Sequence, residues 1–404
     1  MRIAGITAEY NPLHDGHQYH IRKTRQCTKA EAIIALISSN FTQRGEPSIV
    51  DKHARASMAI ACGADLVLEL PCAFSCRNAG IFADAAMDIF GATGLVNIVS
   101  FGTEAGDDGK KLFEDISRIL NDEPEEFKIS LKKFLGAGYS FVQSRSMALD
   151  GLIPGALALL STPNNNLALA YIKRIREKKY GMETFHVQRI GTGFHDRETK
   201  IGGYASAASV RAALERGGAK AARGLVPDAC GDILSAEICG GHAVIGSETL
   251  WRAVKMAALR SSPEDMADIA EMREGLENRM RRAAYEAASL NEFVDFCTSR
   301  RYPAGRIRRY CIHLLLNLRQ ERSRIFQERG PAYIKVLAAN GAGREVLKLM
   351  RKTASLPLLS KPGGRITRYS SEIMNFERAA SEVWETLTDR PRQNAESGAH
   401  AVMS

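Results

Sequence analysis

The sequence predicts an α/β fold, with a Rossmann-like domain and a parallel sheet over residues 1–215 and an all-helical domain over residues 216–388. Three observations predict it. Short apolar runs alternate with helical patterns of roughly ten to fifteen residues in the first half of the chain. Polar or glycine-rich loops follow these runs. Beyond about residue 212, helical periodicity replaces the strand signals.

Five apolar runs predict the strands, because they are rich in small and β-branched residues and end at turn-forming residues. They span residues 3–8, 32–38, 64–70, 96–101 and 183–190. Helical patterns begin near residue 16, occupy residues 48–63 and 79–91, and begin again near residue 206. A polar helical stretch over residues 113–145 is interpreted as an insertion over the sheet. Ligands of such sheets bind at the carboxyl ends of the strands, where the polar loops leave.

The second half of the chain predicts helices followed by a tail. The helical segments span residues 247–260, 263–288, 289–299, 303–329, 331–338 and 342–353. We place the domain boundary near residues 215–225, where Gly217, Gly218, Gly224 and Pro227 fall together. Residues 389–404 are polar and poor in apolar side chains, so this tail is predicted to be disordered.

The composition indicates a cytoplasmic protein with an anionic partner. Hydrophobic residues make up 45% and charged residues 25%, as in ordinary globular proteins. No cationic leader opens the chain, and no apolar run approaches the roughly 18 residues of a membrane span. The net charge of +9 favours a nucleotide or nucleic acid partner. The eight cysteines are scattered without a CxxC pair, which predicts reduced core thiols rather than disulfides or a zinc site.

The strongest local signal is His14-Asp15-Gly16-His17, where a predicted strand passes through a turn into a helix. Gly16 lets the backbone approach a phosphate closely, and the helix N-terminus offers unpaired N–H donors. The imidazoles of His14 and His17 add donors to the α-phosphate oxygens of a triphosphate. We predict that they stabilise the charge that develops when a nucleophile attacks that phosphorus. A chance tetrapeptide is the alternative, and the flanking strand and helix argue against it.

Residues 204–211 form a second candidate phosphate loop, because hydroxyls and N–H groups open a helix with an arginine one turn in. Here we expect Ser209 and Arg211 to hold the β,γ-phosphates. Taken alone, such a segment is more often a plain helix N-cap. Its place in the same domain as the histidine motif favours phosphate binding.

Polar loops after two other strands add substrate and nucleotide candidates. In residues 40–47, Asn40 and Arg44 are predicted to bind substrate, because an arginine pairs with a carboxylate or phosphate in two hydrogen bonds. A solvated turn with a surface Arg–Glu pair is the alternative. Residues 101–107 suit close approach by an adenine or ribose, although glycine-rich turns are common. Residues 162–166 place amides at a helix start, where capping is the default explanation.

Positive charge is concentrated between Arg301 and Arg368, where sixteen Lys or Arg residues face three acidic ones. A continuous basic surface suits a nucleic acid backbone, because each phosphate contact releases counterions. Arg306, Arg308 and Arg309 are therefore predicted to bind RNA. A merely solvated face is the alternative, but such a face normally mixes the two signs.

Together these segments resemble the tRNA(Met) cytidine acetate ligase family, bacterial cytoplasmic enzymes related to nucleotidylyltransferases. The resemblance extends over nearly the whole chain and implies an HxGH nucleotidylyltransferase type of Rossmann domain. It rests on GITAEYNPLHDGH at residues 5–17, NFTQRGEPSIVDK at 40–52, ADLVLELP at 64–71, FGTEAGD at 101–107, TPNNNLALAYIK at 162–173, FHD at 194–196, SAASVR at 206–211, RIRRYCIHLLLN at 306–317 and LPLLSKP at 356–362.

The resemblance implies an ATP-dependent ligase that activates acetate as acetyl-adenylate. The acetyl group then passes to N4 of the wobble cytidine of elongator tRNA(Met). We expect Mg²⁺ to accompany ATP, and the helical domain to bind the tRNA. The preferred acyl donor, the basis of tRNA selectivity and the oligomeric state are left open.

The resemblance also assigns residues to ATP. They are Thr7, Ala8, Glu9, Tyr10, Asn11, Pro12, Leu13, His14, Asp15, Gly16, His17, Gln18, Tyr19 and His20, together with Gly102, Asn165 and Arg189. Asn164 and Asn166 adjoin Asn165, so the choice among the three amides stays open. Two departures are visible, because Asp15 stands where an asparagine is usual and Thr162 where a serine is usual. Asp15 puts a carboxylate near the phosphates, so it either faces away or helps to hold Mg²⁺.

Two other functions fit parts of the pattern. A small-molecule adenylyltransferase would use the histidine motif and the 204–211 loop equally well, but would have no use for the basic helical half. A non-catalytic RNA-binding protein with a nucleotide-binding fold would not need an intact histidine motif. ATP binding, and AMP transfer to phosphate esters without tRNA, distinguish the three.

Overall fold

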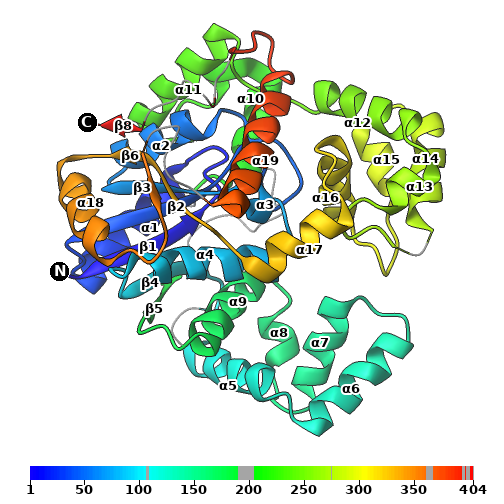
Figure 1. Ribbon diagram of the computed structural model, residues 1–404, viewed down its shortest axis with the longest axis horizontal. Coiled ribbons are helices and arrows are strands. Elements are labelled where there is room, and N and C mark those ends of the chain that lie inside the picture. Colours follow the sequence, from blue (N-terminus) through cyan, green and yellow to red (C-terminus); the bar gives the residue numbers. More distant parts are fainter. Residues whose placement is uncertain are drawn as a thin grey trace.

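A computed structural model describes residues 1–105, 109–189, 204–273, 275–360, 367–393, 396 and 401–403. One sheet organises the molecule, with strand order β5-β4-β1-β2-β3-β6-β7 and β8 beside β6 (Figure 1). The strands are β1 Ile3–Ala8, β2 Ala32–Ser38, β3 Leu66–Leu70, β4 Ile98–Thr103, β5 Glu183–Gln188, β6 Ile334–Ala339, β7 Leu358–Leu359 and β8 Val402–Met403. Strands β1 to β5 are parallel, and β6 is antiparallel to β3.

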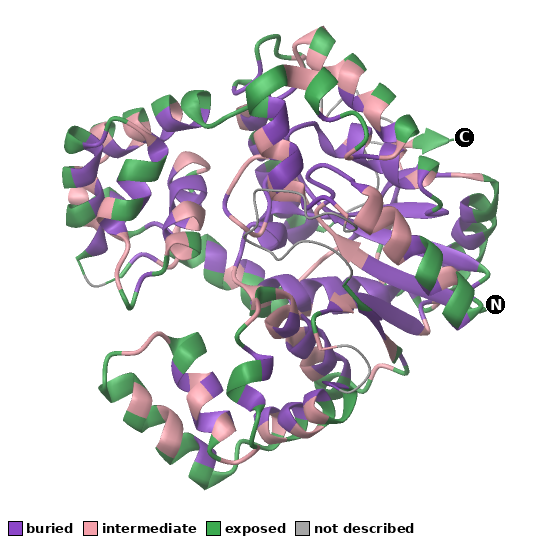
Figure 2. Ribbon diagram, turned by 180° about the vertical axis from the view of Figure 1, so that it is seen from behind, coloured by how far each residue is buried: buried purple, intermediate pink, exposed green. Residues whose placement is uncertain are grey.

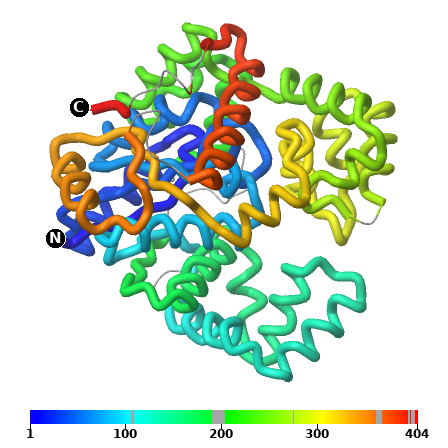
Figure 3. The backbone as a smooth tube through the Cα atoms, in the orientation of Figure 1, coloured from blue at the N-terminus to red at the C-terminus, as the bar shows by residue number. Residues whose placement is uncertain are grey.

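Helices cover both faces of this sheet. Those of the first half are α1 Asp15–Thr28, α2 Lys52–Ala61, α3 Cys72–Ser75, α4 Ala79–Thr93, α5 Gly109–Asp122, α6 Glu125–Gly136, α7 Phe141–Asp150, α8 Ala156–Leu159, α9 Pro163–Glu177 and α10 Ala207–Ala221. Helices α1 and α2 lie on one face, with α11 packed on α2, while α4 and α9 lie together on the other face. Helices α5 to α8 form a lobe beside α9 (Figure 3).

The remaining helices form a second lobe and then return to the sheet (Figure 1). They are α11 Asp228–Gly240, α12 Glu248–Arg260, α13 Pro263–Ala267, α14 Leu276–Glu286, α15 Leu290–Cys297, α16 Ala304–Leu315, α17 Gln320–Arg329, α18 Gly341–Thr353 and α19 Arg368–Glu385. Helices α12 to α16 pack on one another, whereas α18 contacts β2, β3 and β6, and α19 contacts α3.

The centre of the sheet is buried from both sides, as Figure 2 shows by burial. Every residue of β2 is buried. Ile34 and Leu36 join the larger core cluster, whereas Ile33 and Ile37 join the cluster on the opposite face. Alternate side chains of a strand point to opposite faces, so a strand covered on both sides must be apolar throughout. This explains why the strand runs of the sequence are continuous rather than alternating.

Gly5 in β1 allows the closest helix contact with the sheet. A Cβ atom at this position would lie 2.8 Å from the ring of Phe90 on α4. Any side chain would therefore displace α4 from β1. The glycine is therefore needed here for packing.

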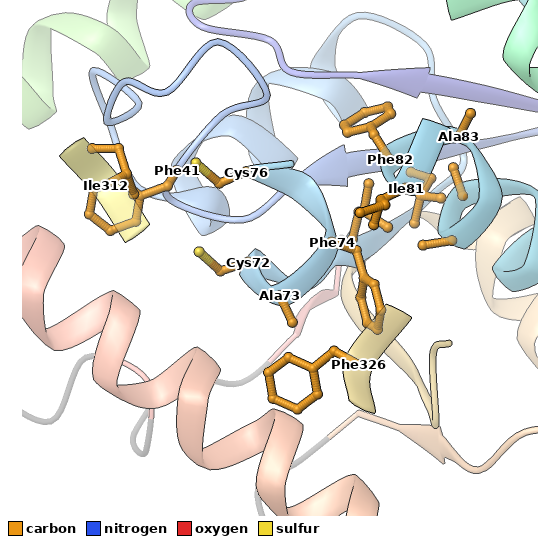
Figure 4. Packing of buried hydrophobic residues seen from close by; sticks show 14 of the residues in the cluster. Phe41, Cys72, Ala73, Phe74, Cys76, Ile81, Phe82, Ala83, Ile312 and Phe326 are labelled. Carbon is orange, nitrogen blue, oxygen red and sulfur yellow. The ribbon is translucent and has the colours of Figure 1, made fainter. Parts of the chain in front are cut away.

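The second lobe is joined to the sheet through the segment after β2. Figure 4 shows Phe41 of this segment beside Ile312 of α16, and Phe74 of α3 near Phe326 of α17. The Phe74 and Phe326 ring centroids are 6.4 Å apart. Aromatic pairs at this separation stabilise by about 0.5–1.5 kcal/mol beyond the area that they bury. This packing brings α16 to the carboxyl edge of the sheet.

The predicted fold class is confirmed, with one error in the second half. Residues 331–338 were expected to be helical, but Ile334–Ala339 form β6 in the main sheet. Between Pro331 and Gly341 the segment Ile334–Ala339 is apolar except for Lys335, and so short a segment fits a buried strand as well as a helical turn, so its pattern could not decide. The second half is therefore mainly rather than entirely helical. Two predicted helices, over 263–288 and 303–329, are each divided into two.

The predicted boundary at residues 215 and 216 lies inside α10. This helix is kinked at Gly217 and Gly218, the latter with a φ of 61°. Parts of four sequence segments lie outside the described residues. They are residue 190 of the predicted strand 183–190, residues 106–107 of FGTEAGD, residues 361–362 of LPLLSKP and the whole of FHD at 194–196.

The tail that composition predicted to be disordered makes contacts at its described residues. Strand β8 pairs with β6, and Arg392 forms ion pairs with Asp51 and Glu237. Glu396 approaches Lys52 at 2.7 Å. Charged side chains that find buried partners offset the lack of apolar residues, which composition alone does not reveal.

Lys52 is the centre of a buried ionic cluster, which we define as Lys52, Glu69, Lys335, Glu377 and Glu396. Its Nζ lies 2.5 Å from Glu69 Oε1 and 2.7 Å from both Glu377 Oε1 and Glu396 Oε2. Burial alone would lower the pKa of Lys52, but the three carboxylates hold it well above its usual value. The cluster joins β3, β6 and α19 around the start of α2.

Two further expectations concern cysteines and membranes. Six of the eight cysteines are buried, Cys27 and Cys239 are exposed, and all eight are free thiols. Within the described part of the chain, no helix is both long and apolar enough to span a bilayer.

Candidate active site

The turn between β1 and α1 is fixed by contacts with the segment after β2. The Asn11 side chain accepts a hydrogen bond from the Ile49 backbone N–H at 2.8 Å. Tyr10 has a left-handed φ of 47°, and Leu13 is fully buried. The turn therefore points some of its residues into the core and presents the others at the carboxyl end of the strand.

His14 and His17 occupy the first turn of α1 and hold each other in place. The Gly16 N–H donates to Nδ1 of His14 at 3.1 Å, and the His14 N–H donates to Nδ1 of His17 at 3.3 Å. Their ring centroids lie 3.8 Å apart. When Nδ1 of a neutral imidazole accepts a hydrogen bond, the ring proton resides on Nε2. Both rings therefore keep an Nε2–H donor for a ligand.

The electrostatic surroundings keep these imidazoles neutral at pH 7. Burial, together with the guanidinium groups of Arg189, Arg211 and Arg44, lowers the pKa of His14 to about 3. Burial, together with His14 and Arg189, also lowers the pKa of His17 well below its usual value. A neutral imidazole donates one hydrogen bond without requiring a buried charge. The arginines thus give the site its positive charge, and the histidines give it neutral hydrogen-bond donors.

A cavity of about 640 Å³ opens at this edge of the sheet. It is lined by the β1 end and α1, the loop after β2, the ends of β4 and β5, and the starts of α9 and α10. Twelve residues that the sequence assigns to ATP line it, namely Thr7, Ala8, Glu9, Tyr10, Asn11, His14, Gly16, His17, Tyr19, His20, Gly102 and Arg189. The cavity is therefore large enough for a nucleotide and lies where the fold class predicts ligands.

Five other predicted ATP residues do not line this cavity, namely Pro12, Leu13, Asp15, Gln18 and Asn165. The pKa of Asp15 is raised by partial burial and by repulsion from Asp228 at the start of α11. Its carboxylate therefore faces α11 rather than the cavity.

Asn165 is buried and its amide is occupied by the protein. Its Oδ1 accepts from the Glu104 N–H at 3.1 Å, and its Nδ2 donates to the Leu159 carbonyl at 2.8 Å. The neighbouring Asn164 and Asn166 line the cavity instead. Asn165 thus shapes this wall. The amide of Asn166 is likewise occupied by the protein, and Asn164 donates its Nδ2 to Glu104 Oε1 at 2.5 Å.

Gly102 and Arg189 form the wall at β4 and β5. A Cβ atom on Gly102 would lie 3.3 Å from Cγ of Arg189, so the arginine stem crosses directly over the glycine. Arg189 Nε lies 3.7 Å from Glu104 Oε1, and burial lowers its pKa. The pair offers a flat backbone surface beside a positive charge, which suits a nucleotide base and phosphate.

The 204–211 loop contributes its backbone more than its predicted side chains. Ser206 caps α10 by accepting from the Ser209 N–H at 3.1 Å, and residues 204–208 line the cavity. The Ser209 hydroxyl is buried and donates to the Ser206 carbonyl at 2.8 Å. Arg211 donates to the Asn11 carbonyl at 2.9 Å and pairs with Glu46 at 3.2 Å. Arg211 therefore braces the β1 turn from behind the cavity.

In the loop after β2, Arg44 and Asn40 are placed differently. Arg44 lines the cavity, and its Nε lies 3.4 Å from Glu9 Oε2. Asn40 is buried, and its Oδ1 accepts from the Lys52 N–H at 2.8 Å. Asn40 therefore shapes the loop that carries Arg44.

The three arginines predicted to bind RNA lie on α16, away from the cavity lining. Arg309 reaches the Gln43 carbonyl at 3.3 Å, Arg308 bonds to Asn291 Oδ1 at 2.9 Å, and Arg306 donates to the Glu271 carbonyl at 3.3 Å. Arg309 thus links α16 to the loop that carries Arg44. Their predicted role in RNA binding stays a prediction.

Several residues that line the cavity are not among the site residues predicted from the sequence. Gln43 follows Asn40 in the same polar loop and could have been included with it. Val142, Gln143, Ser146, Leu157 and Leu160 come from α7, α8 and the residue after α8. Only the first two fall in residues 113–145, which were interpreted as a polar insertion, and the sequence suggested no role for the rest of this region. Its approach to the site depends on long-range packing, which no local motif predicts.

Known proteins match the chain over almost its whole length. The family described as HIGH Nucleotidyl Transferase matches residues 1–398. A tRNA(Met) cytidine acetate ligase of Thermoanaerobacter sp. (strain X514) is 34% identical over 389 residues, covering 96% of this chain and 94% of that protein. The protein of the same name from Syntrophomonas wolfei is 34% identical over 408 residues, covering 97% and 96%.

Solved structures match equally well. The crystal structure of Thermotoga maritima TmcAL in its apo form I has a TM-score of 0.95 and 28% identity, covering 100% of this chain and 99% of that one. The form II structure of the same protein, bound with alpha-thio ATP, has a TM-score of 0.91 at the same identity and coverage.

Proposed function

The chain belongs to the HIGH nucleotidyl transferase family and, within it, to the tRNA(Met) cytidine acetate ligases, and on this premise we propose how its residues perform the reaction. It is an ATP-dependent ligase that joins acetate to a cytidine of tRNA(Met). In the first step, acetate attacks the α-phosphorus of ATP, and pyrophosphate leaves. In the second, N4 of the wobble cytidine of elongator tRNA(Met) takes the acetyl group from acetyl-adenylate. Because its substrate is a tRNA, we propose that the enzyme acts in the cytoplasm.

The pair of histidines at the cavity carries the proposal. Their free Nε2–H groups are the donors that an α-phosphate oxygen requires as negative charge builds on it. Because both rings are braced by backbone N–H groups, they need little reorganisation during the reaction. Donors fixed in this way typically contribute about 10²–10³-fold in rate. His14 and His17 would therefore stabilise the transition state of adenylation.

Other walls of the cavity would hold the rest of the substrates. The N-terminus of α10, capped by Ser206, presents backbone N–H groups suited to the β,γ-phosphates. Ser209 would act there by fixing the cap, because its N–H donates to Ser206 Oγ, and Arg211 would act through its charge and its hold on the turn. Gly102, Arg189 and the amides near Asn165 would contact the nucleoside side.

Arg44 would bind the acetate carboxylate. It is the cavity arginine contributed by the β2 side of the sheet, across from Arg189, and a guanidinium pairs readily with a carboxylate. Placing acetate here brings its oxygen toward the α-phosphorus held at His14 and His17. The two arginines would therefore separate the acyl side of the cavity from the nucleoside side.

Mg²⁺ would arrive with ATP and be held chiefly by the phosphates. Within the described residues, no group of three or more His, Cys, Asp or Glu side chains is arranged to hold a metal ion. Magnesium commonly keeps several waters and needs few protein carboxylates when phosphates are present. Bound in this way, it would neutralise charge on the leaving pyrophosphate.

We propose that residues 1–215 carry the catalytic site and residues 216–388 bind tRNA. The support is the excess of positive charge after residue 301 and the contact of α16 with the loop that carries Arg44. Phosphate contacts on such a surface would make tRNA affinity fall with added salt.

The test replaces His17 by asparagine, whose Oδ1 can accept the His14 N–H as Nδ1 does now. Acetate-dependent exchange of pyrophosphate into ATP should fall about 10²-fold or more, while tRNA binding is retained. His242→Asn, at a histidine that does not line the cavity, is the matched control. Exchange at the wild-type rate in His17→Asn would remove the proposed role of the histidine pair. Wild-type protein that adenylates small phosphate esters but never acetylates tRNA would overturn the tRNA assignment.

A further inference from the structure

Glu9 is the one carboxylate among the described residues that line the cavity. The basic side chains that line it are imidazoles and guanidinium groups, among them His14, His17, Arg44 and Arg189. Such a set suits phosphates and acetate, which are anions. A carboxylate facing the same anions is repelled by them, so its presence needs a different partner.

The carboxylate is held in place but not fully occupied. Glu9 Oε1 accepts from the Gln43 N–H at 2.8 Å, and Oε2 lies 3.4 Å from Arg44 Nε. An ionised carboxylate has about four lone-pair positions, so Oε2 can accept another hydrogen bond. The Glu9 side chain keeps 23% of its surface exposed toward the cavity. Burial raises the pKa of Glu9, although Arg44 opposes this.

The location of Glu9 separates it from the nucleoside side of the cavity. It directly follows β1 and pairs with the loop after β2, whereas Gly102 and Arg189 come from β4 and the end of β5 on the other side of β1. Glu9 is thus next to Arg44, where we place the acetate carboxylate. A group that attacks the activated acetyl carbon must approach from this same region.

We propose that Glu9 forms the subsite for the exocyclic amine of the acceptor cytosine and takes its proton during acetyl transfer. The inference rests on the proposed function and adds a role that ATP binding does not include. Carboxylates are the side chains that accept hydrogen bonds from N4 of cytosine. Arg44 and the Gln43 N–H hold the carboxylate toward the acyl group, so recognition and proton transfer use the same atom.

Acetyl transfer by this route conserves atoms and electrons. The lone pair of N4 forms a bond to the acetyl carbonyl carbon, and the bond from that carbon to the AMP oxygen breaks. AMP leaves with the electron pair, and one N4 proton passes to Glu9 Oε2, from which water later removes it. No oxidant or additional reactant is needed. A general base positioned in this way contributes about 10²–10⁴-fold.

The experiment measures the two half-reactions separately in Glu9→Gln and Glu9→Asp. Acetate-dependent pyrophosphate exchange reports adenylation, and single-turnover transfer from preformed acetyl-adenylate to tRNA reports the second step. We expect Glu9→Gln to lose about 10²-fold or more in transfer. Exchange should fall far less, because Glu9 contributes to adenylation only through its contact with Arg44. Glu9→Asp should recover part of the transfer rate. Glu114→Gln, on the exposed side of α5, is the matched control.

The pH dependence of transfer provides the readout that a merely structural role would not change. In wild-type protein the rate should decline as pH falls through the raised pKa of Glu9, because the protonated acid cannot accept the N4 proton. Glu9→Gln should lack this decline. Transfer by Glu9→Gln at the wild-type rate, or equal loss of both half-reactions, would refute the subsite. Absence of exchange in wild-type protein would instead refute the proposed function.

Discussion

Two groups of charged and polar side chains differ in what they face, because one faces a cavity and the other faces only protein. The cavity cluster, defined as Glu9, His14, His17, Arg44 and Arg189, faces a 640 Å³ space. In the buried ionic cluster around Lys52, oppositely charged side chains face one another, and Lys52 and Glu69 are only 1% and 0% exposed. A charge surrounded by opposite charges stabilises a fold, whereas a donor or acceptor left facing a cavity is available to a ligand.

The pKa directions express the same difference. In the ionic cluster, although burial opposes the shift, the opposite charges of Glu377, Glu396 and Glu69 hold the pKa of Lys52 well above its usual value. In the cavity cluster, burial lowers the pKa of His14 to about 3, and the charges that add to this shift are like charges. A phosphate would supply the negative charge that the cavity cluster lacks. The cavity cluster is therefore complete only when substrate is bound.

The largest expected effect is on stability, in Lys52→Met. Methionine fills a similar volume but leaves Glu69, Glu377 and Glu396 without their shared cation. Removing one partner of a buried ion pair typically costs about 3–5 kcal/mol. Urea unfolding followed by circular dichroism should show this loss, while Lys23→Met on the exposed side of α1 should unfold near the wild-type midpoint. Equal stability of the two variants would mean that the cluster does not hold the fold.

A smaller effect, on both stability and activity, is expected for Gly45→Ala. Gly45 has a φ of 76°, and a Cβ atom there would lie 2.3 Å from the Arg309 backbone nitrogen. The loop must move away from α16, at a cost of about 1–3 kcal/mol, and Arg44 must move with it. The Michaelis constant for acetate in pyrophosphate exchange should therefore rise.

Gly138→Ala is the control that separates backbone strain from the clash. Gly138 has a φ of 82°, but a Cβ atom there would have no heavy atom of the described residues within 4 Å. Its cost should be limited to the strain of a left-handed conformation, roughly 1–2 kcal/mol, with acetate kinetics unchanged. If both variants affected the acetate dependence equally, the contact of the Gly45 loop with α16 would have no part in placing Arg44.

The two clusters also differ in how far the sequence could predict them. His14 and His17 lie in one short motif after a clear strand, so both the fold and their position were predictable. The other members of the buried ionic cluster are spread over β3, β6, α19 and the tail, and no local pattern joins positions 69, 335 and 377. Strand β6, which the sequence did not predict, contributes Lys335 to this cluster, so the strand and the cluster were missed together.

Within the predicted site, the sequence could place a residue near the cavity but not say which way its side chain faces. Residues 204–211 were predicted as a phosphate loop, and their backbone does line the cavity. The side chains of Ser209 and Arg211 turn instead toward the protein. Side-chain direction in a turn depends on neighbours such as Asn11 and Glu46, which come from other segments.

The smallest effect is expected at Asp15, which stands between the two histidines yet faces α11. Asp15→Asn removes the repulsion from Asp228 but also removes an acidic group from the first turn of α1, where it interacts favourably with the helix dipole. These effects oppose each other, so stability should change by less than about 0.5 kcal/mol. Because the carboxylate does not line the cavity, the exchange rate and its Mg²⁺ dependence should match those of wild-type protein. A lower exchange rate that excess Mg²⁺ restores would instead place Asp15 at the phosphates, and the cavity cluster would then have to include a metal ligand.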